Sequence, residues 1–180
     1  MAKRYWRTAS SLLFCLAFLQ LSAQSEAEAT PTIEWLSWDE AMSRMQQAPK
    51  KIFIDVYTDW CGWCKRMDAT TFTDPLVIEV MNEHFYAVKF NAEQKEDIHY
   101  DGHTLKFKPS GRRGAHELAI ALLDGKLSYP SFVYLAEDRT RITIAPGYKD
   151  AAMMALELDY IGGEHWKEQT FEQFRQAQGK

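Results

Sequence analysis

The chain has 180 residues, of which 46% are hydrophobic and 13% aromatic, and its formal net charge is −4. This length favours one domain or one domain plus a tail, and the apolar content is enough for a core, which excludes a mainly disordered chain. The sequence has no long basic run, so nothing in it indicates binding of nucleic acid through phosphates. Three cysteines are too few for a small protein held together by disulfides.

The N-terminal segment carries a pattern typical of a secretory signal peptide. Lys3, Arg4 and Arg7 precede an apolar run at residues 12–19, and small and polar residues follow at 22–25. A basic start, a short apolar centre and small residues after it are the three parts of such a peptide. The run is too short to span a bilayer, which needs about 20 apolar residues. An uncleaved anchor and a buried helix are the alternatives.

We expect cleavage to remove residues 1–23 and to leave residues 24–32 as a polar linker. Cleavage takes away three basic residues and no acid, so 18 basic and 25 acidic residues remain, a net charge of −7. It also removes Cys15 and leaves Cys61 and Cys64 in a compartment where disulfides persist. The sequence carries no endoplasmic-reticulum retention signal. We therefore expect secretion across the inner membrane into a bacterial periplasm, with no stable membrane anchor after cleavage.

From residue 33 onward, helical and strand patterns alternate, which is typical of an α/β domain. Residues 52–57 form an apolar, β-branched run that predicts a strand buried on both faces. Asp74 followed by Pro75 predicts a helix start. We expect helices at 35–47, 61–69, 75–85, 115–123 and 150–160, and strands at 52–57, 86–90, 131–135 and 141–144, with the last two strands antiparallel.

Two segments are less regular. Residues 92–113 are polar and contain glycine, and they predict either a long loop or a small hairpin. Trp166, Phe171 and Phe174 give the C-terminal stretch the spacing of a short amphipathic segment.

Cys61-Gly62-Trp63-Cys64 is the strongest chemical motif of the sequence. It follows a predicted strand and opens a predicted helix, so the two cysteines share a helix face and their sulfurs can bond. Free backbone N–H groups at the helix start favour a thiolate at Cys61, which makes Cys61 the candidate nucleophile. We also expect its sulfur to be the more exposed of the two. Cys64, one turn deeper, is the candidate resolving cysteine that closes the intramolecular disulfide.

Three other interpretations of the cysteine pair are weaker. A structural zinc site needs four ligands, and His99, His103 and His116 do not have a recognised spacing for it. Attachment of c-type haem needs a histidine directly after the second cysteine, where Lys65 stands. A purely structural disulfide over two intervening residues removes little entropy from the unfolded chain. We expect no metal and no cofactor beyond a redox-active disulfide.

Residues 54–65, Ile-Asp-Val-Tyr-Thr-Asp-Trp-Cys-Gly-Trp-Cys-Lys, resemble the active-site segment of the thioredoxin superfamily. Tyr129-Pro130 resembles the cis-proline loop that faces the dithiol in this superfamily, and Gly147 resembles the glycine before its last helix. Residues 71–77 further resemble the C-terminal domain of the thiol:disulfide interchange protein DsbD.

The resemblance implies a thioredoxin-like three-layer α/β fold, with a central mixed β-sheet flanked by helices. It predicts a thioredoxin-like domain at 33–162, a C-terminal helical extension at 163–180 and an insertion near 92–113. The sequence departs from thioredoxin itself at Gly62-Trp63, where thioredoxin has glycine and proline.

The resemblance also implies roles for two charged residues. It places the family's buried carboxylate at Asp55, where a raised pKa suits it to accept the proton of Cys64. It places Lys89 on the adjacent strand, as the lysine that pairs with this acid. The alternatives are a strand-end residue bonded to a loop for Asp55 and an ordinary edge lysine for Lys89.

The candidates for contacting a substrate surround the dithiol: Trp60, Gly62, Trp63, Tyr129 and Pro130. A cis proline exposes backbone groups of its neighbour, which can pair with an extended substrate strand. Only ~5–6% of X–Pro bonds are cis, so a trans bond is the alternative. We expect Trp63 on an apolar rim and Trp60 packed under the active-site loop.

We therefore expect an exported thiol:disulfide oxidoreductase that reduces disulfides in periplasmic proteins through Cys61 and Cys64. The expected partners are exported proteins with disulfides and a membrane electron donor of the DsbD type. One alternative is a disulfide oxidase or isomerase, because Gly62-Trp63 does not fix the redox potential. The other is a non-catalytic thioredoxin-like binding module that holds partners in the groove by Pro130.

Overall fold

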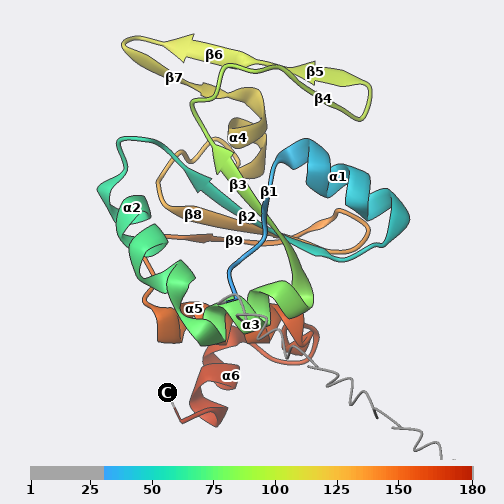
Figure 1. Cartoon of the computed structure of the whole chain (residues 1–180), viewed down its shortest axis with the longest axis vertical. Coiled ribbons are helices and arrows are strands. Elements are labelled where there is room, and N and C mark those ends of the chain that lie inside the picture. The colour runs from blue at the N-terminus through green and yellow to red at the C-terminus, as the bar shows by residue number, and fades with distance from the viewer. Residues whose placement is uncertain (1–30, 180) are drawn as a thin grey trace, which may run out of the picture. The chain divides into compact units, whose positions relative to one another are not determined.

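A mixed five-stranded sheet organises the residues that this computed structural model describes, 31–179 (Figure 1). Its strands are β1 (Trp35–Leu36), β2 (Lys51–Tyr57), β3 (Phe85–Asn91), β8 (Ser131–Leu135) and β9 (Arg141–Pro146), in the spatial order β1-β3-β2-β8-β9. β1 and β2 run parallel to β3, whereas β8 is antiparallel to both β2 and β9. The predicted mixed sheet and the antiparallel pairing of its last two strands are confirmed.

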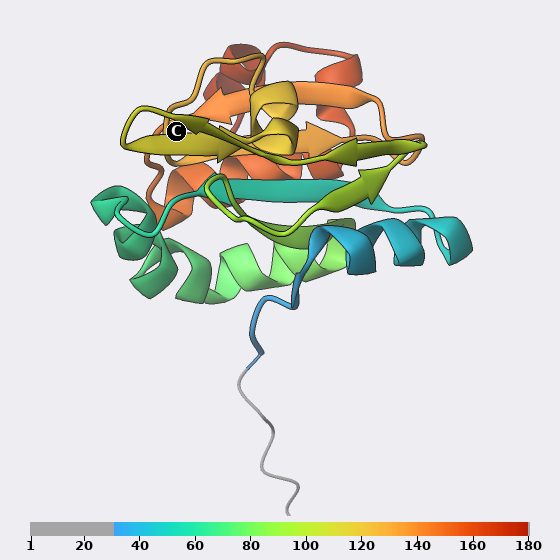
Figure 2. The same ribbon diagram turned by 90° about the horizontal axis from the view of Figure 1, so that it is seen from above.

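Helices cover both faces of this sheet and complete the predicted three layers (Figures 1 and 2). α1 (Trp38–Gln47) and α4 (Glu117–Leu122) pack on one face. α2 (Gly62–Ala69), α3 (Pro75–His84) and α5 (Ala151–Gly162) pack on the other face, with the 3-10 turn η1 (Thr71–Thr73) between α2 and α3. The 3-10 turn η2 (His165–Lys167) and α6 (Phe171–Ala177) follow α5. None of the helices within residues 31–179 has the length and apolar character needed to cross a bilayer.

Strand β2 lies between two apolar layers. This explains why apolar and polar residues do not alternate along it. Ile54 and Val56 pack in the layer under α1 and α4, whereas Phe53 packs in the layer under α3 and α5. Residues 51–56 are all buried, as expected for a strand covered on both faces. Asp55 belongs to this strand, so the fold places a carboxylate inside the protein.

Local capping signals set where the helices begin. The Asp74 carboxylate accepts the N–H of Leu76 at 3.0 Å and Pro75 is the first residue of α3, as predicted. Ser37 and Glu40 form a reciprocal capping box at the start of α1.

Three predicted boundaries are wrong. Residues 35–36 pair with β3 as a strand, because the helix starts only after its cap at Ser37. The helix predicted at 115–123 starts at Glu117, since the His116 ring caps it by accepting the N–H of the second helical residue. Phe85 begins β3 instead of extending the apolar stripe of α3.

Residues 92–113, predicted as a long loop or a small hairpin, form most of two hairpins. β4 (Ile98–Tyr100) pairs with β5 (His103–Leu105), and β6 (Phe107–Ser110) pairs with β7 (Arg113–His116), both antiparallel. Gly102 and Gly111 stand in the two turns with φ of 76° and 58°, a region that favours glycine. The hairpins lie beyond α4 in Figure 1 and cross in front of the sheet in Figure 2.

Residues 1–30 and 180 lie outside the described residues. The predicted signal peptide at 1–23 and most of the linker at 24–32 fall there. These two segments stay predictions, as does the division into a domain at 33–162 and an extension at 163–180.

Candidate active site

The first turn of α2 holds both cysteines. After β2, a short turn leads to Cys61, whose N–H donates to the Thr58 carbonyl at 3.0 Å. Cys61 is the N-cap of α2, and its sulfur accepts the N–H of Cys64 at 3.1 Å. A disulfide joins the two residues, with their Cα atoms 5.3 Å apart. The motif therefore stands at a helix start, where backbone N–H groups stabilise negative charge on sulfur.

Both cysteines are buried in this disulfide-bonded state. Their exposed fractions are 4% for Cys61 and 2% for Cys64, so the expected contrast in exposure is small here. The two sulfurs differ in position instead. Cys61 precedes the first helical turn and Cys64 lies within it, which favours the charged form at Cys61.

Asp55 and Lys89 meet across the parallel pair β2 and β3. The register sets the two residues opposite each other, and the Lys89 Nζ donates to the Asp55 Oδ2 at 2.6 Å. Lys89 also pairs with the carboxylate of Asp68 on α2. Burial lowers the pKa of Lys89, but the two carboxylates more than offset this, so its pKa is raised. The charged lysine is therefore held in place between β2 and α2.

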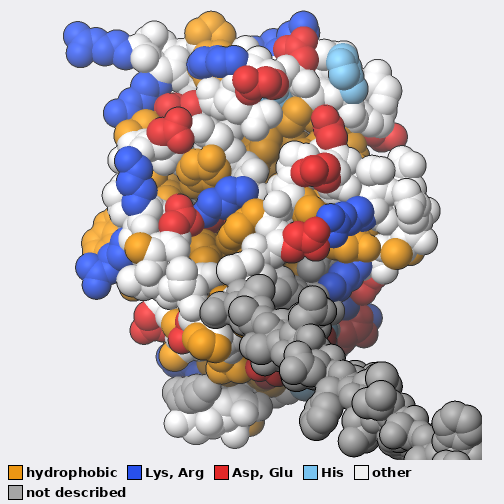
Figure 3. Space-filling view, in the orientation of Figure 1, with side chains coloured by type: hydrophobic (Ala, Val, Ile, Leu, Met, Phe, Trp, Pro, Cys, Tyr) orange, Lys and Arg blue, Asp and Glu red, His pale blue; other side chains and the backbone are white. Residues whose placement is uncertain are grey.

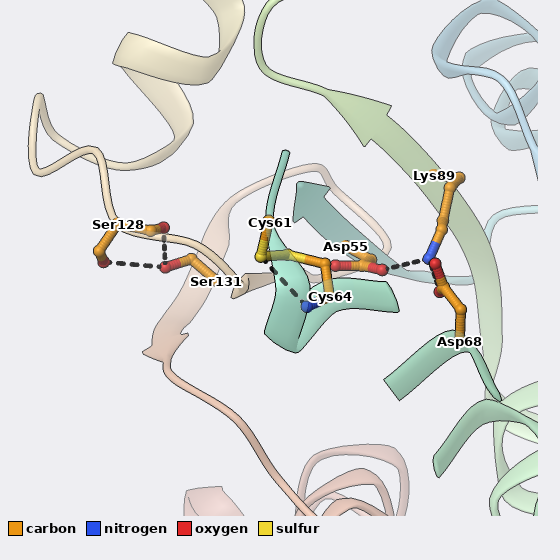
Figure 4. Close-up of a disulfide and its surroundings, with 7 residues drawn as sticks. All are labelled: Asp55, Cys61, Cys64, Asp68, Lys89, Ser128 and Ser131. Carbon is orange, nitrogen blue, oxygen red and sulfur yellow. Dashed lines mark hydrogen bonds and ion pairs between the residues drawn. A yellow bond between two sulfur atoms is a disulfide. The ribbon is translucent and has the colours of Figure 1, made fainter. Parts of the chain in front are cut away.

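The Asp55 carboxyl is only 1% exposed, and its Oδ1 has no hydrogen-bond partner among residues 31–179. Burial raises the pKa of Asp55 to about 6, even though Lys89 acts in the opposite direction. Figure 4 shows the Asp55 side chain lying between Cys64 and Lys89. A carboxyl group whose pKa lies near neutrality, beside the resolving cysteine, suits transfer of the proton of that thiol.

The loop before β8 approaches the disulfide from the other side. The Tyr129–Pro130 peptide bond is cis, and the Pro130 carbonyl accepts the N–H of Gly147 at 2.8 Å. Ser131 pairs with the end of β2 in the sheet, and its hydroxyl donates to the Ser128 carbonyl at 2.7 Å. In Figure 4 Ser131 lies on the Cys61 side of the disulfide, opposite Asp55. The sheet thus brings the proline loop and the dithiol together.

Two exposed tryptophans flank the cysteines. Trp63 is 56% exposed, as expected for a rim residue, and its ring lies 5.0 Å from that of Tyr148. The prediction that Trp60 packs under the loop is wrong, because Trp60 is 51% exposed. Its ring meets the Tyr129 ring edge-on at 5.9 Å, so a neighbour from the proline loop holds it at the surface.

Three residues of the site were missed by sequence reasoning. Asp68 follows Cys64 by four positions, a spacing that places both on one helix face and could have indicated it. Tyr148 and Arg113, which contacts the Trp60 ring, come from distant segments. The sequence gives no signal for these two long-range contacts.

A zinc site has no ligand set in the described part of the chain. Within residues 31–179, no three His, Cys, Asp or Glu side chains converge in a way that could hold a metal ion. His116, one of the candidates, is buried and uses both ring nitrogens, one toward the Glu96 carbonyl and one toward the Leu118 N–H. That histidine joins the inserted hairpins to α4.

Comparison with known families identifies the chain. Residues 19–154 match the model of the family described as Thioredox_DsbH, protein of unknown function, DUF255. The match spans well over half of the chain, so the protein belongs to this family.

Curated relatives match a shorter part. An uncharacterized protein, B0495.5, from Caenorhabditis elegans is 30% identical over 71 residues, which are 39% of this chain and 10% of that protein. Spermatogenesis-associated protein 20 from Rattus norvegicus is 28% identical over 67 residues, 37% of this chain and 8% of that protein. The matched region thus spans about a tenth of the length of these relatives.

Solved structures share the fold. A structure titled DsbH Oxidoreductase aligns with a TM-score of 0.53 at 17% identity, over 81% of this chain and 92% of that one. A thioredoxin from Thermus thermophilus aligns with a TM-score of 0.55 at 16% identity, over 72% and 87%. A thioredoxin-fold protein from Helicobacter pylori gives 0.54 at 15% identity, over 79% and 83%. The predicted thioredoxin-like fold is confirmed.

The family, the fold and the disulfide-linked C-x-x-C pair together support a thiol:disulfide oxidoreductase at a general level.

Proposed function

We propose that this member of the Thioredox_DsbH family reduces disulfide bonds in exported proteins through Cys61 and Cys64. One observation carries the proposal. The N-cap cysteine of α2 is joined to Cys64 by a disulfide, and the buried Asp55 carboxyl lies beside it. A helix start, a second thiol within bonding distance and a proton acceptor are the three groups that disulfide exchange needs.

The reaction begins from the reduced protein. The Cys61 thiolate attacks one sulfur of a client disulfide, so a bond forms between the two proteins while the client's S–S bond breaks. The second client sulfur leaves as a thiolate and takes up a proton. Cys64 then loses its proton and attacks the Cys61 sulfur, which releases the first client sulfur and closes the Cys61–Cys64 disulfide. The client gains two electrons, and this protein loses two.

Asp55 is the group that takes the Cys64 proton in the second step. Its pKa of about 6 leaves it mostly ionised near neutral pH, but basic enough to accept a proton transiently. Lys89 lies on the side of the Asp55 carboxyl away from Cys64 (Figure 4). Its positive charge lowers the pKa of Asp55 against the effect of burial, so it favours the ionised form of the carboxyl. Asp55 acts on Cys64, and Lys89 positions Asp55.

The buried Asp55 charge also supports the direction of electron flow. A negative carboxylate beside the sulfurs repels the negative charge that they carry when reduced. This repulsion destabilises the reduced form relative to the disulfide, which makes the reduced protein a better electron donor. The disulfide must then be reduced again, and a membrane dithiol of the DsbD type is the donor class that we propose.

The site of action rests on the sequence pattern at residues 1–23, which is typical of a signal peptide. We place the reaction in the periplasm, where client proteins contain disulfides.

Reduction of insulin by the reduced protein tests the chemistry. We expect turnover by the wild type and none by Cys61→Ser. Cys64→Ser should accumulate mixed disulfides with clients, because nothing resolves the first adduct. Mass spectrometry of the adducts that Cys64→Ser traps in the source cell envelope identifies the clients. Equal behaviour of both variants and the wild type would instead favour a non-catalytic binding module.

Equilibration with glutathione buffers tests the direction. A reductant is expected near the thioredoxin end of the known range, roughly −270 mV, and an oxidase near the DsbA end, about −120 mV. A potential close to the second value would overturn the assignment as a reductant.

A further inference from the structure

Two arginines lie over aromatic rings in the region around the disulfide. On the Trp60 side, the guanidinium carbon of Arg113 lies 4.0 Å from the centre of the Trp60 ring, and the Trp60 ring contacts Tyr129 of the proline loop. Arg113 is the first residue of β7, so the inserted hairpin reaches back to the active-site loop. The insertion therefore takes part in the surface around Cys61.

The other arginine–aromatic contact lies on the Trp63 side. The Arg66 guanidinium carbon lies 5.7 Å from the centre of the Trp63 ring and 5.9 Å from that of Tyr148. Trp63 and Tyr148 are themselves in contact, and both are exposed. Trp60 and Trp63 thus each have one tyrosine and one arginine as neighbours.

These two arginines lack a carboxylate partner. Within residues 31–179, neither Arg66 nor Arg113 forms an ion pair or a side-chain hydrogen bond. The neighbouring hairpin lysines do have such partners: Lys106 pairs with Asp97 and Lys108 with Glu117.

The charge around these arginine–aromatic contacts contrasts with that of the whole chain. The chain has a net charge of −4, yet Figure 3 shows Lys and Arg side chains along the edge formed by α2 and the tip of the β6–β7 hairpin. Lys65 and Arg112 are sequence neighbours of the two arginines and add to this charge. Two acids lie near this surface. The Asp59 carboxylate accepts a hydrogen bond from Asn91 at 3.1 Å, and Glu93 is close enough to Tyr129 that its charge, after burial, raises the pKa of that tyrosine.

A guanidinium that lies over an aromatic ring keeps its N–H edge available for hydrogen bonds. That planar edge matches a carboxylate, which can accept two parallel N–H groups. The ring beneath also limits the freedom of the arginine, so less entropy is lost when the carboxylate binds. Two such groups on either side of a reactive sulfur form a recognition surface for a peptide with acidic residues.

We propose that Arg66 and Arg113 select client segments that carry Asp or Glu on both sides of the cysteine attacked by Cys61. This inference rests on the proposed function and names its substrate class. The acidic residues bind the arginines, while the exposed Trp60 and Trp63 rings contact the backbone and apolar parts of the segment. The hairpin insertion thereby contributes client selection to the dithiol site.

Single-turnover reduction of three cyclic disulfide peptides tests this selection. The peptides differ only in the residues that flank each cysteine, which are Glu, Gln or Lys. The pre-reduced full chain is mixed with each peptide, and the rate is divided by the rate at which dithiothreitol reduces the same peptide. This ratio removes the effect of the flanking charges on the disulfide itself.

For the wild type at low ionic strength, we expect the Glu peptide to react about fivefold faster than the Gln peptide, and the Lys peptide to react more slowly than both. Added salt should reduce the preference, because the arginines are at the surface. The double variant Arg66→Gln and Arg113→Gln should react with the Glu and Gln peptides at nearly equal rates. Arg44→Gln is the matched control, since Arg44 also lies over an aromatic ring, Tyr86, at 5.9 Å, and its variant should keep the wild-type preference.

A charge reversal gives a second test if the double variant folds poorly. Arg113→Glu should lower the rate for the Glu peptide and raise it for the Lys peptide. Equal rates of the wild type with the Glu and Gln peptides, or a preference that survives the double variant, would overturn the selection. Reduction of the Gln peptide by the wild type keeps the proposed function intact in that case, whereas failure to reduce any peptide or insulin would overturn the function itself.

Discussion

The Asp55–Lys89 pair and the Glu157–Lys149 pair place the same two functional groups in two regions of the fold. Asp55 lies in the central strand β2, and Glu157 lies in α5. Both carboxyl groups are buried, and burial raises the pKa of each while the partner lysine acts in the opposite direction. Measured by burial and charge alone, the two pairs are alike.

They differ in how the carboxyl oxygens are used. Glu157 has a partner at each oxygen, because the Tyr134 hydroxyl donates to Oε1 at 2.7 Å and Lys149 lies 3.5 Å from Oε2. Asp55 has Lys89 at Oδ2 and no partner at Oδ1 among the described residues. Its free oxygen belongs to the side chain that lies beside Cys64 (Figure 4). A buried carboxyl becomes a candidate proton acceptor only when one oxygen is left for the proton.

The largest expected difference between the two pairs is in the rate of disulfide closure when each acid is replaced by its neutral amide. We expect Asp55→Asn to slow closure of the Cys61–Cys64 disulfide roughly 10- to 100-fold near neutral pH, because the acceptor of the Cys64 proton is lost. Glu157→Gln should leave this rate unchanged. Rapid-quench trapping of the mixed disulfide with a model peptide measures the step, and a slow Glu157→Gln variant would show that the comparison is mistaken.

Asp55→Asn should slow disulfide closure but raise the free energy of unfolding. The folded pKa of Asp55, about 6, lies above the unfolded value of 3.8, so the folded state holds more protons between these values. The stabilisation is complete below the unfolded pKa and is lost as pH rises through about 6. Ionised Asp55 therefore costs up to about 3 kcal/mol near neutral pH.

We accordingly expect Asp55→Asn to raise the free energy of unfolding of the disulfide form by about 1–3 kcal/mol near neutral pH. The gain should shrink as the pH falls below 6 and vanish below 3.8. Denaturant titrations across this range measure it. A gain that does not depend on pH would mean that folding does not raise the pKa of Asp55.

Removing each lysine gives a smaller effect that again distinguishes the pairs. Without Lys89 nothing opposes the effect of burial on Asp55, so its pKa should rise above about 6. In Lys89→Met we expect the pH midpoint of disulfide closure to move upward by about one unit. Lys149→Met should not move it. An unchanged midpoint in Lys89→Met would separate Asp55 from the proton transfer.

The smallest effect is expected from the hydroxyl that satisfies Glu157. Tyr134→Phe removes its hydrogen bond and should lower the free energy of unfolding by about 1 kcal/mol, with no change in the rate of disulfide closure. Thermal unfolding and the peptide assay measure the two quantities. A slower closure in this variant would link the Glu157 region to the active site.

The sequence by itself determined the features that depend on neighbouring residues. Cys61 and Cys64 follow a strand and begin a helix, so their sulfurs meet through local geometry. Asp74 and Pro75 mark a helix start for the same reason. Asp55 was recognisable because a carboxylate stands in an otherwise apolar strand. Its pairing with Lys89 depended on the family resemblance, which supplied the register between the two strands.

Only the tertiary structure decided the contacts between distant segments. The exposure of Trp60 depends on Tyr129 and Arg113, which come from the proline loop and from an inserted hairpin. Periodicity and capping reveal which face of an element is apolar, but they contain no information about which remote segment covers it. The oxygen that Asp55 keeps free, and that Glu157 does not, is likewise set by side chains brought together in folding.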